Sequence, residues 1–317
     1  MEKPKVRISV RNLVEFILRS GDLDNSRGSS GDKEAMLKGG RLHRKIQRSM
    51  KGNYQAEVSL KRESEYEDTI IQVEGRADGI FTEDGEVWID EIKGTYGNLQ
   101  AMEMPVPVHR AQAMCYGWIY GEKEGLSQIG IQMTYSHLDT EDTRRFREIF
   151  SMEELKKWYQ ELLDAYHKWI AYSLSWKKER NASMTDLQFP FPYREGQREI
   201  VSGVYHTVSS KKTLFVQAPT GVGKTMSAIF PSVRAIGEGK GETLFYLTAK
   251  TITGTVAWEA FHTLRENGLK FKVTAITAKE KLCFLDSPEC TPEKCPYAKG
   301  HFDRVNDAVY ELWTTEE

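Results

Sequence analysis

The chain has 317 residues, of which 39% are hydrophobic and 28% are charged, and this composition is typical of a folded globular protein. The formal net charge of −2 excludes a strongly basic overall field, so any binding of nucleic acid has to rest on local basic surfaces. No apolar run reaches the roughly 18 residues of a membrane span, and the amino terminus lacks the apolar core of a secretory signal. We therefore expect a two-domain cytoplasmic protein that does not enter the membrane.

Two helices are expected at the start of the chain. Residues 8–19 have the apolar spacing of a helix that ends before Gly21, and residues 32–51 form a second helical pattern that carries His43. One face of the second pattern is basic: Arg41, Arg44, Lys45, Arg48 and Lys51. That face is either a phosphate contact beside His43 or a solvated helix surface.

A β-rich region follows. Residues 54–60 alternate between apolar and polar side chains, and residues 69–74 are rich in β-forming types, so each run predicts a strand. The dipeptide Asp84-Gly85 is typical of a two-residue hairpin turn. With these two residues as the turn, Glu83 pairs with Glu86 and every pair of opposed positions is fixed.

The hairpin register places Asp78 directly opposite Glu91. Cross-strand partners have Cβ atoms about 5 Å apart, where two like charges destabilise the sheet unless something neutralises them. A divalent cation would do so. Lys93 points to the same face as Glu91 because side chains alternate along a strand, whereas Asp90 points to the other face. Two carboxylates and a lysine suit hydrolysis of a phosphodiester with Mg²⁺ or Mn²⁺.

Four motifs in this half resemble, in order and spacing, those of RecB-like PD-(D/E)xK nucleases. They are Gly40-Arg41-Leu42-His43, Gly75-Arg76-Ala77-Asp78, Asp90-Glu91-Ile92-Lys93 and Gln112-Ala113-Met114-Cys115-Tyr116. The resemblance implies a restriction-endonuclease-like α/β domain over residues 1–182. It implies the metal ligands His43, Asp78 and Glu91, the catalytic lysine Lys93, and the DNA-positioning residues Gln112 and Tyr116. Proline does not precede Asp78, and a relative that only binds DNA would keep most of this pattern, so that alternative stays open.

The remainder of the first half is predicted to be scaffold. Residues 129–135 and 144–150 are expected to form two more strands. A long amphipathic helix is expected from Ser151 to about Ser175, with capping residues at its start. The polar residues 176–183 that follow are interpreted as the linker to a second domain, which spans residues 183–317.

The second domain opens on residues 189–197, where two prolines among aromatic residues predict an extended approach to a helix that starts near Arg194. An aromatic residue and Gln197 just before a phosphate-binding loop resemble the Q-type motif of superfamily 2 helicases. The resemblance implies that Gln197 contacts adenine. The alternative is that this segment is simply the first helix of the domain.

A phosphate-binding loop is expected between an apolar run at residues 213–216, predicted as a buried strand, and a helix that starts near Met226. The expected ATP-binding residues are Ala218, Pro219, Thr220, Gly221, Val222, Gly223, Lys224 and Thr225. In this pattern backbone N–H groups surround the phosphates, the lysine reaches the terminal phosphates and the threonine hydroxyl ligates Mg²⁺. The alternative is a glycine-rich turn that happens to carry Lys-Thr.

A second buried strand that runs into a loop is predicted at residues 243–251, which resemble helicase motif Ia, and a third strand is predicted at residues 271–276. Cys283, Cys290 and Cys295 then resemble the iron–sulfur insertion of XPD/DinG-type helicases. The resemblance implies a 4Fe–4S cluster whose fourth ligand lies beyond Glu317. The rival interpretation is a zinc site of these three cysteines with His301. The remaining cysteine, Cys115, is expected to be a packed core thiol.

No apolar strand ending in Asp-Glu follows Thr225, so the motor is incomplete, and the chain is either a fragment of a longer helicase or a truncated form. The resemblance implies a DinG-like nuclease–helicase in DNA repair. Such an enzyme cleaves DNA that has single-stranded segments and unwinds it from 5′ to 3′ with ATP. Two alternatives remain: a chain that binds DNA and nucleotide without catalysis, and a metabolic P-loop kinase.

Overall fold

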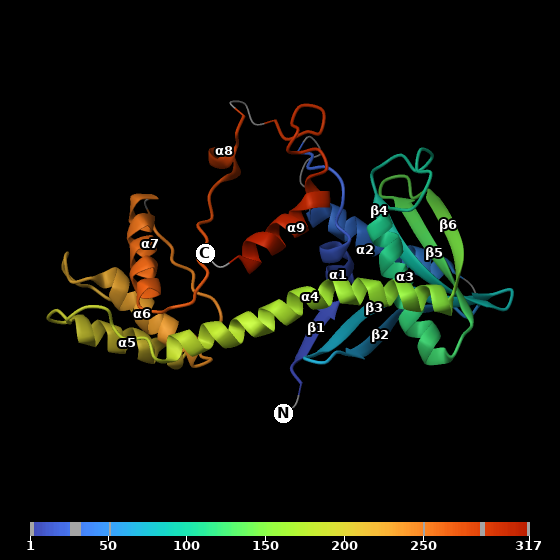
Figure 1. Cartoon of the computed structure of the whole chain (residues 1–317). Coiled ribbons are helices and arrows are strands. Elements are labelled where there is room, and N and C mark those ends of the chain that lie inside the picture. The colour runs from blue at the N-terminus through green and yellow to red at the C-terminus, as the bar shows by residue number, and fades with distance from the viewer. Residues whose placement is uncertain (1–2, 26–32, 51, 250, 286–288, 316–317) are drawn as a thin grey trace. The chain divides into compact units, whose positions relative to one another are not determined.

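The computed structural model describes residues 3–25, 33–50, 52–249, 251–285 and 289–315 (Figure 1). The chain divides into two compact units, one formed by residues 1–171 with 283–315 and the other by residues 172–282. The cysteine-bearing segment therefore groups with the first unit, whereas the sequence predicted it with the second domain. Within the described residues, no helix is both long and apolar enough to cross a membrane.

The first unit is built on a six-stranded mixed sheet with helices, as expected for an α/β fold (Figure 1). Its strands are β1 (Lys5–Ser9), β2 (Gln55–Glu65), β3 (Ile70–Glu83), β4 (Glu86–Thr95), β5 (Gln128–His137) and β6 (Thr143–Ser151). The order is β1-β3-β4-β5-β6, and β2 pairs with β3. The pairs β1–β3 and β4–β5 are parallel, and the other pairs are antiparallel. The two strands predicted after residue 128 are confirmed as β5 and β6.

The helices of the first unit are α1 (Val10–Ile17), α2 (Lys33–Ser49), α3 (Pro107–Glu124), most of α4 (Met152–Thr185) and α9 (His301–Thr314). The predicted opening helix starts too early. Ile8 pairs with Val73 in the sheet, and α1 begins only after Ser9, whose hydroxyl accepts a hydrogen bond from the Asn12 amide at 3.1 Å. A side-chain cap of this kind fixes the helix start. The end of the second predicted helix, including Lys51, lies outside the described residues.

The predicted linker at residues 176–183 is wrong, because α4 continues without a break to Thr185. These residues are polar, but they contain neither glycine nor proline, and most of them have good helix propensity. Met184, at the end of the helix, is fully buried in the second unit. Polarity here marks a solvated helix surface and not a flexible connection.

The predicted β3–β4 hairpin is confirmed. Asp84 and Gly85 have φ of 52° and 85°, as a type I′ turn requires, and Glu83 pairs with Glu86. The register continues to the pair Gly79 and Asp90. Asp78 and Glu91 lie one step beyond this last observed pair, where the predicted register would place them opposite each other.

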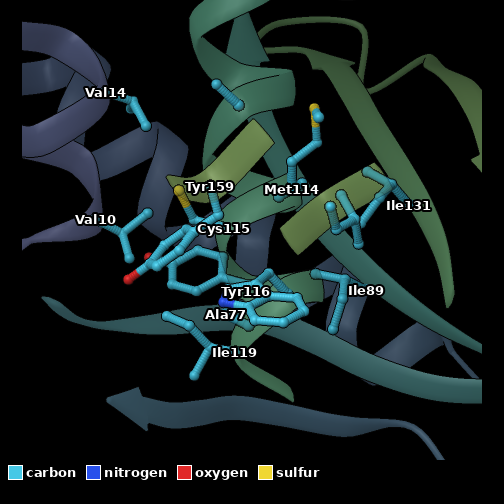
Figure 2. Packing of buried hydrophobic residues seen from close by; sticks show 14 of the residues in the cluster. Val10, Val14, Ala77, Ile89, Met114, Cys115, Tyr116, Ile119, Ile131 and Tyr159 are labelled. Atoms are coloured by element: carbon cyan, nitrogen blue, oxygen red, sulfur yellow. The ribbon is translucent and has the colours of Figure 1, made fainter. Parts of the chain in front are cut away.

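The core of the first unit lies between the sheet and α3, which packs on β4 and β5. Met114 and Cys115 of α3 belong to the same buried cluster as Ile89 of β4 and Ile131 of β5 (Figure 2). Cys115 is fully buried, and burial raises the pKa of its thiol. The interpretation of Cys115 as a packed core thiol is confirmed.

Gly79 leaves room for the ring of Tyr54, with which a Cβ at this position would collide. We expect Gly79→Ala to lower the free energy of unfolding by about 1–3 kcal/mol, because either the ring or the strand has to move. Urea denaturation measures the loss. In a Tyr54→Ala background the same substitution should cost much less; an equal cost in both backgrounds would contradict this explanation.

The second unit holds the end of α4 with α5 (Gln197–Ser209), α6 (Lys224–Gly237), α7 (Thr251–Glu266) and α8 (Lys279–Leu282). The prediction of strands at residues 213–216, 243–251 and 271–276 is wrong for the residues described. Phe215, Leu247 and Ile276 are 93%, 88% and 92% exposed, and Thr251 begins a helix. Apolar runs supply β propensity, but a strand also needs a neighbour for its backbone groups, and no strand pairing occurs among the described residues of this unit.

Candidate functional site

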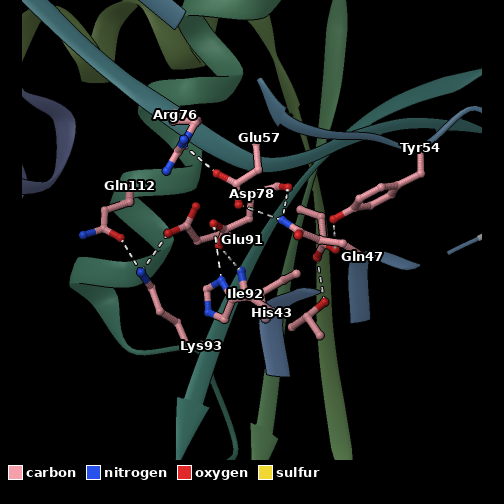
Figure 3. Close-up of polar contacts among 12 residues, drawn as sticks. His43, Gln47, Tyr54, Glu57, Arg76, Asp78, Glu91, Ile92, Lys93 and Gln112 are labelled. Carbon is pink, nitrogen blue, oxygen red and sulfur yellow. Dashed lines mark hydrogen bonds and ion pairs between the residues drawn. The ribbon is translucent and has the colours of Figure 1, made fainter. Parts of the chain in front are cut away.

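Two carboxylates, an imidazole and an ammonium group converge where α2, β3 and β4 meet (Figure 3). Lys93 Nζ lies 2.8 Å from Glu91 Oε1, and His43 Nδ1 lies 3.6 Å from Asp78 Oδ1. The amide of Ile92 donates to Asp78 Oδ2 at 2.7 Å. The four side chains predicted as a nuclease centre are thus brought together by one helix and one hairpin.

Asp90 lies on the opposite face of β4, as the alternation of the strand predicted. Its carboxylate is fully buried and accepts hydrogen bonds from Thr134 at 2.6 Å, from Gln132 at 2.9 Å and from Tyr54 at 3.1 Å. Burial raises the pKa of Asp90, while these three hydrogen bonds oppose the rise. Asp90 therefore belongs to a closed polar network and not to the cluster around Glu91.

Glu91 is the most perturbed acid of the cluster. Burial and then the charge of Asp78 raise its pKa to about 7, and Lys93 only partly opposes them. Burial alone lowers the pKa of His43, but the contact with Asp78 and the charges of Asp78 and Glu91 outweigh it, so its pKa lies above the usual value. The site thus favours positive charge close to its carboxylates.

The donor set fits a hard divalent cation. Glu91 Oε2 is buried and has no hydrogen-bond partner among the residues that the structure describes, whereas Oε1 is bound to Lys93. Carboxylate oxygens, with an imidazole beside them, are ligands that Mg²⁺ and Mn²⁺ accept. Within the described part of the chain, however, no group of three or more His, Cys, Asp or Glu side chains has an arrangement that could hold a metal ion.

The raised pKa of Glu91 predicts pH-dependent metal binding. A proton competes with the cation for this carboxylate below about pH 7 and is absent well above it. We expect Mn²⁺ to raise the melting temperature of the metal-free protein several-fold more at pH 8 than at pH 6, as measured by differential scanning calorimetry. An equal shift at both pH values would show that Glu91 does not take part.

Gln112 and Tyr116 share one face of α3, but both are buried. Gln112 Oε1 accepts a hydrogen bond from Lys93 Nζ at 2.8 Å, so its amide fixes the direction of the ammonium group. Tyr116 packs over Gly75, where a Cβ would lie 2.7 Å from the tyrosine hydroxyl oxygen. The role of these two residues in positioning DNA stays a prediction. In the structure Gln112 contacts Lys93.

Sequence reasoning missed the side chains around Asp78. Gln47 lies one turn after His43 on α2 and donates to the Asp78 carbonyl at 2.9 Å and to Glu57 at 3.0 Å. Glu57 in turn pairs with Arg76 at 2.5 Å. The spacing of four residues places His43 and Gln47 on one helix face, but nothing in the sequence indicates which strand that face meets.

The basic face of α2 is exposed at its described positions: Arg41, Arg44, Lys45 and Arg48. On the opposite side of the helix Leu42 and Ile46 pack against Ile92 of β4, which fixes the helix on the sheet. Lys45 forms an ion pair with Glu141. Both interpretations of this face, phosphate contact and solvated surface, remain open.

The phosphate loop has the predicted turn and helix, but the described residues 213–216 directly before it do not form a strand. Gly221 and Gly223 have φ of 87° and 79°, and α6 starts directly after them at Lys224. Lys224 Nζ donates to the loop carbonyls of Ala218 at 2.9 Å and Pro219 at 2.7 Å, so the lysine reaches across its own loop.

Gln197 packs against the phosphate loop at Gly223. It is 4% exposed, and a Cβ on Gly223 would lie 2.6 Å from its Nε2. Its Oε1 accepts a hydrogen bond from the Arg194 amide at 3.0 Å, and the Arg194 guanidinium binds the Gly221 carbonyl. Gln197 therefore contacts the loop itself, and its predicted contact with adenine remains untested.

Cys283, Cys290 and Cys295 are free thiols, and they do not form a metal-holding group within the residues described. Their segment belongs to the first unit, where the Asn25 amide donates to the Cys290 carbonyl at 2.9 Å. His301 begins α9. The iron–sulfur and zinc interpretations both stay predictions.

No family model matches the chain. A stretch of 47 residues, 14% of the chain, is 40% identical to a probable ATP-dependent helicase of Methanocaldococcus jannaschii, of which it spans only 7%. The crystal structure of SSO0001 resembles 51% of this chain and 78% of its own, at 21% identity and a TM-score of 0.34.

Proposed function

We propose that the first unit is a metal-dependent deoxyribonuclease of the PD-(D/E)xK type. The observation that supports this proposal is the buried Glu91 Oε2 beside Asp78, which has no hydrogen-bond partner among the described residues. The ammonium group of Lys93 pairs with the other oxygen of Glu91 and donates a hydrogen bond to Gln112. A buried carboxylate oxygen without a partner is costly to maintain, and a bound cation would satisfy it.

In this proposal Asp78, Glu91 and His43 hold Mg²⁺ or Mn²⁺, which supplies an activated water and charge stabilisation for phosphodiester hydrolysis. Lys93 places its ammonium where negative charge develops on the phosphate. Gln112 orients that ammonium through the 2.8 Å hydrogen bond. Because the site is largely buried, these charges act in a medium of low dielectric constant, where they stabilise the transition state more strongly than in water.

For the second unit we propose ATP binding, in which residues 218–225 hold the phosphates and Thr225 ligates the Mg²⁺ of the nucleotide. The loop-to-helix geometry and the short similarity to a probable helicase support this part. The chain as a whole would then be a nuclease–helicase acting in DNA repair on DNA with single-stranded segments, with 5′–3′ unwinding and an iron–sulfur or zinc site at its cysteines.

A second candidate is a chain that binds DNA and nucleotide without catalysis. One observation in its favour is that Lys224 binds carbonyl groups of its own loop. Another is that the second unit has no sheet among its described residues, so that Phe215 and Leu247 are exposed. Mn²⁺-dependent cleavage of DNA by the purified chain would exclude this candidate for the first unit.

The test of the nuclease proposal is cleavage of end-labelled single-stranded DNA by metal-stripped protein with added Mn²⁺. We expect cleavage by the wild type and a loss of about 10²–10³-fold for Lys93→Ala. Lys61→Ala, which removes an exposed lysine of β2, serves as the matched control and should keep wild-type activity. Equal, metal-independent cleavage by the wild type and by Lys93→Ala would contradict the proposal.

A further inference from the structure

The main chain of Asp78 lies at a break in the pairing of β3. On one edge β1 pairs with β3 as far as Glu74, and β4 pairs with it only from Gly79 onward. On the other edge β2 pairs with β3 on both sides of Asp78, but Asp78 and Glu57 are not paired with each other. Asp78, which carries a carboxylate of the proposed site, therefore has no paired residue on either edge, although its neighbours Ala77 and Gly79 pair with β2.

Two hydrogen bonds take the place of that pairing (Figure 3). The Ile92 amide donates to the Asp78 side chain at 2.7 Å, and Gln47 Nε2 donates to the Asp78 carbonyl oxygen at 2.9 Å. The same nitrogen donates to Glu57 Oε1 at 3.0 Å. Since Gln47 lies one turn after His43, its amide ties the helix that carries the imidazole to the strand that carries the carboxylate.

Glu57 has a backbone that suits this arrangement. Its φ of 59° lies in the left-handed region, which residues other than glycine rarely adopt. The side chain of Glu57 accepts from Gln47 and also pairs with Arg76 at 2.5 Å. Strained conformations of this kind persist where the surroundings hold them, and they cluster at functional sites.

We propose that Gln47 is a positioning residue, which sets the separation between His43 and Asp78 and thereby the affinity of the site for its divalent cation. This inference rests on the proposed metal-dependent nuclease. Gln47 does not touch the cation or the substrate; it acts through the main chain of Asp78. Partners that orient a metal ligand in this way typically change metal affinity by about 10- to 100-fold when they are removed.

The test is calorimetric titration of the metal-stripped full chain with Mn²⁺. Gln47→Leu keeps the bulk of the side chain but removes both donors, and we expect at least a tenfold loss of Mn²⁺ affinity. Gln160→Leu is the matched control, because Gln160 also donates its amide to a carboxylate, Asp164 at 2.8 Å, on the distant helix α4. The control should keep wild-type Mn²⁺ affinity, and the metal-free melting temperature of each variant is measured to show that both proteins are folded.

A second variant separates the two contacts of Gln47. Exchanging Gln47→Glu with Glu57→Gln in one protein restores a side-chain pair with reversed roles but supplies no donor from position 47 to the Asp78 carbonyl. We expect its Mn²⁺ affinity to stay low. Recovery of wild-type affinity by this exchange, or an unchanged affinity in Gln47→Leu, would overturn the positioning role while the nuclease proposal stands. Failure of the wild type to bind Mn²⁺ would overturn both.

Discussion

Glu91→Gln should abolish metal-dependent DNA cleavage and at the same time stabilise the fold. We expect cleavage to fall by about 10³-fold or more, because the substitution removes a charged ligand. At pH 8 we expect the free energy of unfolding of the metal-free protein to rise by about 1–3 kcal/mol, because the variant no longer buries an ionised carboxylate. A mutation that inactivates and stabilises together is the signature of a residue kept for function.

The sign of this effect follows from the pKa of Glu91. The pKa of Glu91 in the folded state, about 7, lies above the usual glutamate pKa of 4.5, so the folded wild type binds more protons than the unfolded chain between these pH values. Wild-type stability therefore falls as the pH rises from about 4.5 through 7, and Glu91→Gln lacks this fall. Urea denaturation at pH 5 and pH 8 measures it. Glu124→Gln, at the exposed end of α3, is the control; a Glu91→Gln protein that is less stable than the wild type at pH 8 would contradict the account.

The largest loss of stability should come from Asp90→Ala. This substitution removes the acceptor of the buried donors of Gln132 and Thr134 and of the half-buried Tyr54 hydroxyl, and we expect a loss of about 3–5 kcal/mol in the free energy of unfolding. Guanidinium denaturation measures it. Thr134→Val removes only one donor at nearly constant volume and should cost about 1–2 kcal/mol. A loss for Asp90→Ala no greater than that for Thr134→Val would mean that the network does not hold the sheet together.

The network also explains why neighbouring acids have different fates. The carboxylate of Asp90 accepts three hydrogen bonds from neighbouring side chains. In Glu91, one carboxylate oxygen pairs with Lys93, and the other has no hydrogen-bond partner among the described residues. The two residues are adjacent in sequence but lie on opposite faces of β4. One face completes its own hydrogen bonding, and the other leaves a carboxylate oxygen unsatisfied.

The candidate site was predictable where it depends on local geometry. The Asp84-Gly85 turn sets the register of the hairpin, the register opposes Asp78 to Glu91, and strand alternation separates Asp90 from Lys93. The contacts of Gln47 were not predictable in this way. They depend on how α2 meets β3, and the packing of Leu42 and Ile46 that fixes this geometry has no counterpart in a local pattern.

Long-range partners account for the other differences. Residues 213–216 and 271–276 have the composition of strands, but composition does not provide neighbouring strands. The cysteine-bearing segment joins the first unit through contacts between residues far apart in sequence. The Leu23 amide donates to Ala298, the Asn306 side chain donates to Phe16, and Trp169 packs against Tyr310.

The central claim is that Asp78 and Glu91 bind a divalent cation. Anomalous X-ray diffraction from crystals of the wild-type chain soaked in Mn²⁺ tests it most directly. The account predicts an anomalous peak in contact with both carboxylates and beside His43, and no peak there in crystals of Asp78→Asn. A fully soaked wild-type crystal at pH 8 with manganese elsewhere and none between these two carboxylates would contradict the claim.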